Sequence, residues 1–243
     1  MMSKTIAFIT DSHIEHQFPK DQGVDALGNW QMVLESVKAH KVDMIIIGGD
    51  IGETKIFEYF FKSLDDLNMP YYSILGNHDK YEDVKPFLNN PLATNPNELF
   101  YTFDEDDFQY IFLDSSRGQV SQFQLDWLEK TLNNSDLKPL VFIHHPLLKV
   151  NTRVDIDYPL HNREAVVEVL NKFDKNIPVI CGHYHTENQS INKNITQYVT
   201  PSAAFQILQN TDQVTLDISK FAYRLIELEN GNFHSRLKWF ALV

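Results

Sequence analysis

Side chains that bind metals gather in five short stretches of the sequence, each directly after an apolar run. Six of the ten histidines lie in these stretches, beside aspartate and asparagine. The stretches are Asp11-Ser12-His13, Gly49-Asp50, Gly76-Asn77-His78-Asp79, His144-His145 and Gly182-His183-Tyr184-His185. Imidazole nitrogens with carboxylate and amide oxygens, and no thiolate, suit Mn, Fe, Zn or Co better than Ca or Mg. The residue types therefore predict a transition-metal site.

Each stretch also has an ordinary structural explanation when it is taken alone. Asp11 is typical of a helix cap, and Gly49-Asp50 is typical of a turn. The recurrence of such stretches after apolar runs argues for a shared site instead. Two carboxylates, one amide oxygen and four imidazoles are too many ligands for one ion, and a carboxylate can bridge. The expected count is therefore two ions, about 3.5–4 Å apart.

Strands and helices are expected to alternate around the first three stretches. Apolar runs predict buried strands at 5–9, 44–47 and 71–75, and helical periodicity predicts helices at 25–41 and 54–67 between them. This β-α-β-α-β order predicts a parallel sheet. In open α/β sheets, ligands bind beyond the carboxyl ends of the strands. We therefore expect the metal-binding side chains to converge on one edge.

The pattern changes after His78-Asp79, and from residue 188 to the end the chain turns to short β runs. Asn230-Gly231 near its end is a strong hairpin signal. The segment 147–161 has little periodicity and is a candidate active-site loop. No repeat or linker divides the sequence, so we expect one domain over residues 1–243. The remaining predictions are a hairpin at 99–103 and 108–113, helices at 121–132 and 162–173, strands at 140–143 and 179–181, a loop at 14–24, a short helix and loop at 82–98, and β runs at 195–199, 205–208, 214–218, 223–228 and 233–239.

The composition, with 43% apolar and 22% charged residues, is ordinary for a soluble globular protein. A net charge of −12 argues against a nucleic-acid binder, because phosphate contacts need a Lys/Arg face. The single cysteine, Cys181, allows no internal disulfide. The N-terminal Met1-Met2-Ser3-Lys4 begins neither a signal peptide nor a membrane span. We therefore expect a cytoplasmic protein with no nucleic-acid or membrane partner, and the sequence permits a homo-oligomer.

The five stretches, in this order, resemble the signature blocks of the calcineurin-like metallophosphoesterase superfamily. Within it, the chain is most similar to bacterial class III cyclic-nucleotide phosphodiesterases and related glycerophosphodiesterases. Ile51-Gly52-Glu53 stands where Ser/Thr protein phosphatases have Asp-Arg-Gly, so that branch is not expected. The resemblance implies an α/β fold: a four-layer sandwich of two mixed β-sheets flanked by helices, with the metals at one edge.

The resemblance also implies a division of the ligands between the two metals. His144 is implied as the ligand, rather than His145, because the family's histidine is the first residue after the strand; His145 would then support the ligands from behind. His161 and Asn162 could touch a ligand, although a capped helix start also explains them. Asp11, His13 and His185 would hold the first metal, Asn77, His144 and His183 the second, and Asp50 would bridge them.

Hydrolysis of a small phosphate diester, such as a cyclic nucleotide, is the leading functional hypothesis. Two metal ions would activate a water and offset charge on the phosphoryl oxygens. His78 is expected to protonate the leaving oxygen as a catalytic residue, with Asp79 orienting it. The alternative is a phosphomonoesterase or nucleotidase with the same metal site. A nuclease and a non-catalytic scaffold rank lower, since the chain is acidic and every expected ligand is present.

Overall fold

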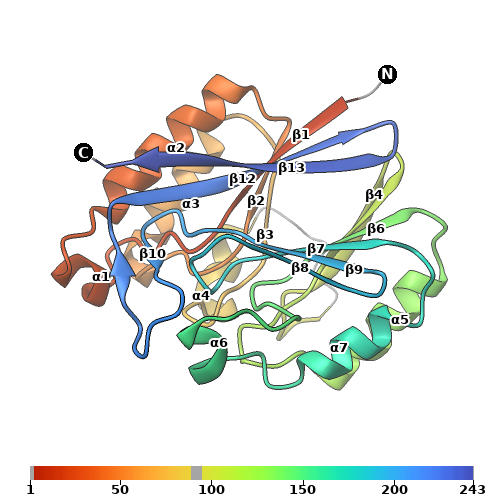
Figure 1. Ribbon diagram of the computed structural model, residues 1–243. Coiled ribbons are helices and arrows are strands. Elements are labelled where there is room, and N and C mark those ends of the chain that lie inside the picture. Colours follow the sequence, from red (N-terminus) through yellow and green to blue (C-terminus); the bar gives the residue numbers. More distant parts are fainter. Residues whose placement is uncertain (1–2, 89–94, 243) are drawn as a thin grey trace.

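Two β-sheets face each other across a shared apolar core in the computed structural model, which describes residues 3–88 and 95–242 (Figure 1). Within these residues, the first sheet has five strands in the order β13 (Asn232–Ala241), β12 (Lys220–Glu229), β1 (Ser3–Ile9), β2 (Met44–Ile47) and β3 (Tyr71–Ser73). The second has six, in the order β4 (Tyr101–Glu105), β5 (Phe108–Phe112), β6 (Lys138–Phe142), β7 (Ile177–Cys181), β9 (Ile195–Val199) and β8 (Asn188–Asn192). A small pair consists of β10 (Gln206–Ile207) and β11 (Leu216–Asp217).

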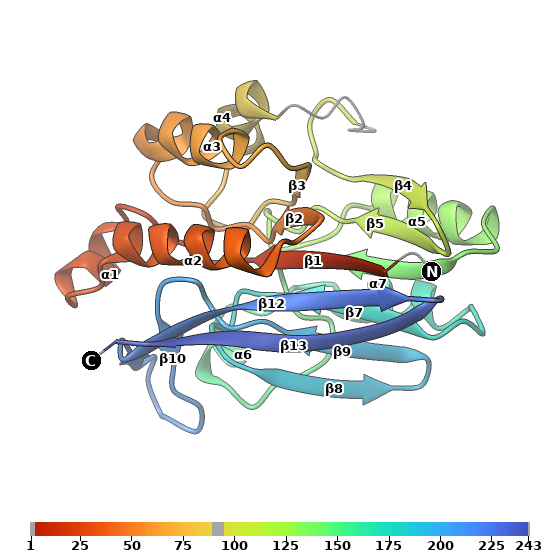
Figure 2. The same cartoon turned by 90° about the horizontal axis from the view of Figure 1, so that it is seen from above.

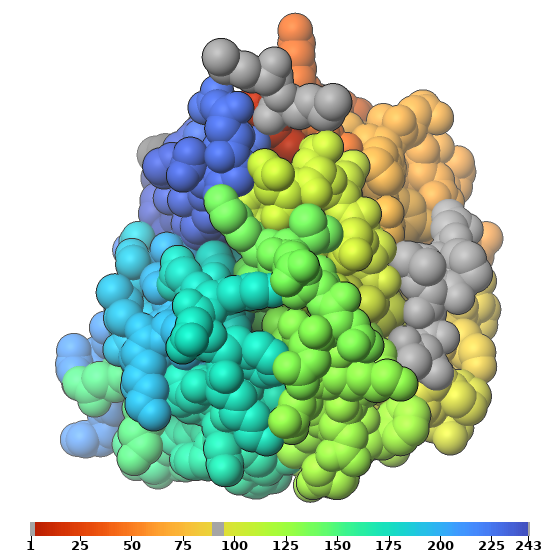
Figure 3. All heavy atoms as spheres, turned by 90° about the vertical axis from the view of Figure 1, so that its right-hand side faces the viewer, coloured from red at the N-terminus to blue at the C-terminus, as the bar shows by residue number. Residues whose placement is uncertain are grey.

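Helices cover the outer face of each sheet. On the first sheet, α2 (Ala26–His40) and α3 (Phe57–Asp65) lie side by side over β1, β2 and β3 (Figure 2), joined by stacking of the Trp30 and Phe60 rings at 4.3 Å. On the second sheet, α5 (Gln122–Asn133) and α7 (Arg163–Leu170) pack against each other on the face seen in Figure 3. The expected four-layer sandwich is confirmed. The shorter helices are α1 (Gln17–Asp21), η1 (Thr54–Ile56), α4 (Tyr81–Val84), η2 (Lys85–Phe87) and α6 (Arg153–Asp157).

Aromatic and aliphatic side chains fill the space between the two sheets. Phe8 of the first sheet stacks on Phe142 of the second, with ring centroids 5.9 Å apart, and Phe112 stacks on Phe142 at 5.1 Å. Each of these rings is at most 1% exposed, and burial of each contributes about 1.5–3 kcal/mol relative to an exposed ring. This core holds the two sheets in one orientation, which aligns their strand ends.

The expected parallel pairing of the first three strands is confirmed, and the second sheet contains parallel pairs as well. β1 pairs in parallel with β2, and β2 with β3. In the second sheet, β5, β6, β7 and β9 pair in parallel in that order. The predicted hairpins, β4–β5 and β12–β13, are antiparallel, and the second turns at Asn230-Gly231. Four of the five metal-binding stretches therefore leave carboxyl ends of strands β1, β2, β6 and β7, and the fifth follows β3 after Ile74 and Leu75.

Three sequence predictions for the secondary structure were wrong. The 14–24 loop contains α1, and the 147–161 loop contains α6, because both helices are single turns too short to show helical periodicity. Strand β8 was missed because it is a polar edge strand with no buried residue. Residues 89–94 of the predicted 82–98 segment lie outside the described residues. No helix within 3–88 and 95–242 is both long and apolar enough to cross a membrane.

Candidate metal centre

The five predicted stretches meet where the carboxyl ends of the two sheets adjoin. Backbone hydrogen bonds join neighbouring turns: Asp11 N donates to Gly49 O at 2.9 Å, and His13 N donates to Asp50 O at 3.0 Å. Within the second sheet, Gly182 N donates to His144 O at 3.0 Å, and between the sheets His183 N donates to Asp11 Oδ2 at 3.0 Å. Left-handed backbone recurs here at five non-glycine residues, a strained conformation that functional sites often retain. They are Asp11 (φ 57°), His13 (φ 43°), Asp50 (φ 54°), His183 (φ 67°) and His185 (φ 48°).

Two glycines allow the Asp50 and Asn77 turns to touch. A Cβ on Gly76 would lie 2.1 Å from Asp50 Oδ1, and a Cβ on Gly49 would lie 2.2 Å from Gly76 N. Gly49 also has φ +92°, which disfavours any side chain. Both contacts are far closer than van der Waals distance. The glycines are therefore required by the close approach of two turns.

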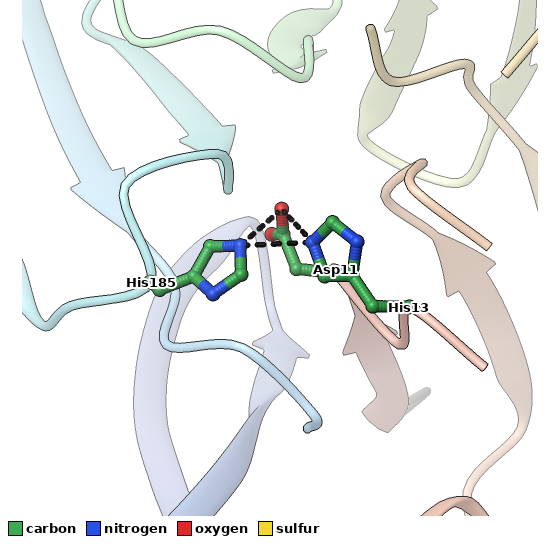
Figure 4. A group of neighbouring side chains, drawn as sticks. All are labelled: Asp11, His13 and His185. Carbon is green, nitrogen blue, oxygen red and sulfur yellow. Dashed lines mark hydrogen bonds and ion pairs between the residues drawn. The ribbon is translucent and has the colours of Figure 1, made fainter. Parts of the chain in front are cut away.

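Asp11, His13 and His185 form the first triad, drawn in Figure 4, and their ligand atoms all lie within 4.8 Å of one another. The Nε2 atoms of the two rings are 3.0 Å apart, and Asp11 Oδ1 is 3.2 Å from His185 Nε2 and 3.8 Å from His13 Nε2. The other oxygen, Asp11 Oδ2, accepts from Thr10 Oγ1 at 2.7 Å and from His183 N at 3.0 Å. This arrangement leaves Oδ1 directed at the two imidazoles.

Asp50, His144 and His183 form the second triad, with the same spacing limit of 4.8 Å. Asp50 Oδ2 is 3.4 Å from His144 Nε2 in this triad and 3.7 Å from His13 Nε2 in the first. Its other oxygen, Oδ1, accepts from His78 N at 2.9 Å. One Asp50 oxygen therefore lies between the two triads, where a bridging carboxylate would have to be.

Two buried polar atoms at the centre lack a hydrogen-bond partner among the described residues: Asp11 Oδ1 and His144 Nε2. A buried polar group without a partner is costly, so such atoms call for an explanation. Both are ligand-type atoms that face the space between the carboxylates and imidazoles. Metal ions in the two triads would satisfy them, so the residues fit a dinuclear centre.

Backbone carbonyls orient three of the four imidazoles. His144 Nδ1–H donates to Gly48 O at 2.7 Å, and His185 Nδ1–H donates to Phe205 O at 3.2 Å, which leaves Nε2 of each ring free as a ligand. His183 is reversed, because its Nε2–H donates to Tyr158 O at 2.9 Å and leaves Nδ1 free. Such bonds fix the tautomer and ring direction of metal ligands.

The electrostatics of the centre favour added positive charge. Burial works against ionisation, yet the His185 and His144 rings hold the pKa of Asp11 below the ordinary range, and the His144 and His13 rings do the same for Asp50. Burial likewise opposes protonation of His144, but the Asp50 and Asp11 carboxylates raise the pKa of His144 to about 10. The carboxylates are thus held ionised at a buried position, where the attraction for a cation is stronger than in water.

The Gly76-Asp79 turn contributes its residues in different ways. Asn77 and His78 are exposed and line the cavity described below. The Asp79 carboxylate accepts from the backbone of Asp50 at 2.7 Å, Ile51 at 3.1 Å and Gly76 at 2.9 Å. In the described part of the chain it makes no bond to the His78 ring. Asp79 therefore braces the Asp50 turn in this structure, and its expected role in orienting His78 stays a prediction.

Three neighbouring residues take other places. His145 is outside the triads; its Nδ1 is bonded to Ser115 Oγ at 2.8 Å, and its ring packs on His183 with centroids 4.2 Å apart. His161 is exposed beside Gly118, away from the cavity. Asn162 makes no side-chain cap bond, since its amide pairs with the backbone of Val120. The predicted cap at Asn162 was therefore wrong.

A cavity of about 600 Å³ opens over the two triads. Its polar lining includes Asp50, Asn77, His78 and metal-facing histidines of both triads. Much of the remaining lining is apolar and comes from α1, α6 and the β10–β11 region, so the 147–161 segment does border the site. These apolar lining residues are Phe18, Pro19, Val154, Tyr158, Phe205, Ile207, Val214 and Leu216.

His16 also lines this cavity and was missed by the sequence analysis. Its Nδ1 lies 2.9 Å from His13 Nδ1, and its ring is 5.1 Å from that of His78. The available signal was its position three residues after His13, but the expected 14–24 loop gave no reason to direct it inward. Only the folded turn brings it to the site.

The fold and the paired triads together define a class, α/β proteins built to hold a dinuclear metal centre at the joint edge of two sheets. The family model of calcineurin-like phosphoesterases matches residues 4–187. The chain belongs to this family, and the predicted class of enzyme, a metal-dependent phosphoesterase, is confirmed.

Curated relatives match most of the chain. A protein of Fibrobacter succinogenes, named a probable cyclic nucleotide phosphodiesterase, is 30% identical over 226 residues, 91% of this chain and 88% of the relative. A probable glycerophosphodiester phosphodiesterase GpdQ of Arcobacter nitrofigilis is 30% identical over 82% of this chain and 78% of the relative. The 3',5'-cyclic adenosine monophosphate phosphodiesterase CpdA of Haemophilus influenzae is 29% identical over 95% and 88%.

Solved structures share the fold at low sequence identity. A dimetal phosphatase from Danio rerio superposes with a TM-score of 0.65 at 15% identity, covering 96% of this chain and 98% of that one. GAP50 of Plasmodium superposes with a TM-score of 0.66 at 12% identity, covering 100% and 89%. These similarities support the four-layer architecture.

Proposed function

We propose that this enzyme hydrolyses small phosphate diesters and that cyclic nucleotides are its preferred substrates. The observation that carries the proposal is the cavity, which joins the two triads to a wall of apolar and aromatic side chains. A cyclic nucleotide matches both features, because its charged diester suits the triads and its aromatic base suits the apolar wall. A glycerophosphodiester would leave that wall without an apolar partner.

The proposed metal ligands follow from the triads. Asp11, His13 and His185 would hold one ion. His144 and His183 would hold the other, with Asn77 as an additional oxygen ligand from the cavity side and Asp50 as the bridge. When bound, the ions supply an activated water and offset negative charge on the phosphoryl oxygens. The protein's own contribution is to hold the carboxylates ionised and the ring lone pairs directed inward.

His78 is proposed as the catalytic general acid. The leaving oxygen of a diester must gain a proton, and His78 carries an exposed imidazole at the cavity, outside both triads. Its backbone N–H donates to Asp50 Oδ1, which fixes the residue beside the bridge position. Its ring centroid lies 5.4 Å from that of His13. A proton donor is thus held next to the phosphate position.

The apolar wall is proposed to hold the nucleobase. Phe205 begins this wall directly beside the first triad, with its ring 4.5 Å from the His185 ring and 5.6 Å from the His13 ring. Phe18 and Tyr158 continue it with rings that are 60% and 62% exposed. Aromatic faces stack well on flat rings and poorly on glycerol. Two of the relatives are named for cyclic nucleotides and one for a glycerophosphodiester.

The test compares substrate classes after reconstitution with Mn. We expect kcat/KM for 3',5'-cyclic nucleotides to exceed that for glycerophosphodiesters and for nucleoside monophosphates. Phe18→Ala should raise KM for the cyclic nucleotide by about 2- to 10-fold, with little change for a glycerophosphodiester. The matched control is Phe123→Ala, since Phe123 is 57% exposed and lies outside the cavity. A preference for monoesters would favour the nucleotidase, and inactivity with both metals bound would favour the scaffold.

Four finer points stay predictions. The mixed nitrogen and oxygen donors support Mn, Fe, Zn or Co as the native pair. We also propose that residues 1–243 act as one domain, since the site needs strand ends from both sheets. A cytoplasmic location and a homo-oligomer rest on the sequence alone.

A further inference from the structure

His16 touches the first triad from outside it. Its Nδ1 lies 2.9 Å from Nδ1 of His13, the ring nitrogen on the side away from the triad. The two ring centroids are 5.0 Å apart, and the rings are tilted by 52°. The contact joins two side chains only three residues apart.

The local backbone produces this contact. Left-handed conformations at His13 (φ 43°) and Glu15 (φ 64°) curl the chain, and His16 N donates to His13 O at 3.1 Å. A parallel bridge between Ile14 and Gly52 ties the same turn to the Asp50 stretch. His16 occupies the N-cap position of α1, but its side chain makes no cap bond. Capping therefore does not explain where the ring lies.

His13 differs from the other three triad imidazoles in what orients it. His144, His183 and His185 donate their outer N–H to backbone carbonyls, whereas the outer nitrogen of His13 meets a side chain. Resting on the metal assignment proposed above, we propose that His16 is a positioning residue that orients His13 and so strengthens metal binding at the first triad. This role is separate from catalysis. It makes the metal affinity of the first triad depend on the His16 side chain, which can be substituted.

The hydrogen balance of the contact supports this role. A bond between two Nδ1 atoms requires a hydrogen on only one of them. If His13 donates through Nδ1–H, its Nε2 keeps a lone pair facing Asp11 and His185. His16 Nδ1 is then the acceptor. The His16–His13 contact therefore suits the tautomer that a metal ligand needs.

The experiment measures metal binding without substrate. Metal-free protein is titrated with Mn by calorimetry, and bound metal is counted by elemental analysis. His16→Ala should weaken one of two binding steps by about 10–100-fold and leave the other unchanged. The weakened step should be the one that His185→Ala abolishes, and not the one that His144→Ala abolishes. His16→Asn places an amide oxygen near the Nδ1 position and should restore most of the affinity.

His40→Ala serves as the matched control, because His40 is a half-buried histidine bonded to the Ser36 carbonyl and not to the site. Unchanged affinity at both steps in His16→Ala would overturn the proposal. Equal weakening of both steps, or a lowered melting temperature of the metal-free protein, would also overturn it by showing a general structural role. None of these readouts depends on which phosphate ester is the substrate, so failure here and failure of the proposed function are distinguishable.

Discussion

The two triads hold similar ligands but are supported differently. In the second triad, the Gly48 and Tyr158 carbonyls orient His144 and His183. In the first, the Phe205 carbonyl orients His185, but His13 is oriented by the His16 side chain. A backbone carbonyl stays in place when a side chain is replaced. The second triad is therefore insensitive to substitutions of its supports, whereas the affinity of the first can be tuned by one residue.

Their surroundings differ as well. The first triad adjoins the apolar wall through Phe205, whose ring lies 4.5 Å from the His185 ring. The second is backed by polar groups, since His145 packs on His183 and is held by Ser115. The apolar wall thus adjoins the first triad, while Asp50 and His183 of the second triad also line the cavity. Substitution of Asp50, which the two triads share, should therefore affect both ions, whereas substitution of a residue that supports one triad should affect one ion.

The largest effect is expected from Asp50→Ala, which removes the group common to both triads. Asp50 Oδ2 lies 3.4 Å from His144 Nε2 and 3.7 Å from His13 Nε2, so its loss should abolish binding of both ions and all activity. Elemental analysis after Mn reconstitution measures this directly. Retention of two ions would contradict the bridge, and loss of one would assign Asp50 to a single triad.

His78→Ala should leave both triads intact and reduce turnover. Loss of a general acid lowers the rate by about 10²–10⁴, with two ions still bound. The loss should shrink for a diester with a p-nitrophenolate leaving group, which needs little protonation. His234→Ala, an exposed histidine on β13, is the control. An equal loss on both substrates would contradict the acid role while leaving the metal assignment untouched.

Asp79→Asn should weaken both ions together by about tenfold, because Asp79 braces the backbone of the shared Asp50. The asparagine side chain would present its NH₂ group to one of the backbone N–H groups from which the Asp79 carboxylate accepts. Because two donors would then face each other, the free energy of unfolding should fall by about 1–3 kcal/mol. Mn calorimetry and urea denaturation measure the two effects, with the exposed Glu82→Gln as control. Weakening confined to one step would show that Asp79 supports only one triad.

Much of the fold could be predicted because the buried strands are nearly continuous apolar runs. Met44–Ile47 is fully buried, as parallel strands covered on both faces require. Helix α2 was predicted because its buried residues recur at helical spacing. Strand β8 and helices α1 and α6 were not, because an exposed polar edge and single helical turns leave no such pattern.

The sequence by itself determined which residue types follow each apolar run, and therefore the family, the fold class and the set of metal-binding side chains. Only the tertiary structure decided what each side chain contacts. It directed Asp79 to the Asp50 backbone instead of the His78 ring, and it turned His16 back onto His13. It also supplied the Tyr158 and Phe205 carbonyls, which carry no sequence signal because every residue has one. Ligand identity is local and can be read along the chain, whereas ligand orientation depends on atoms that meet only after folding.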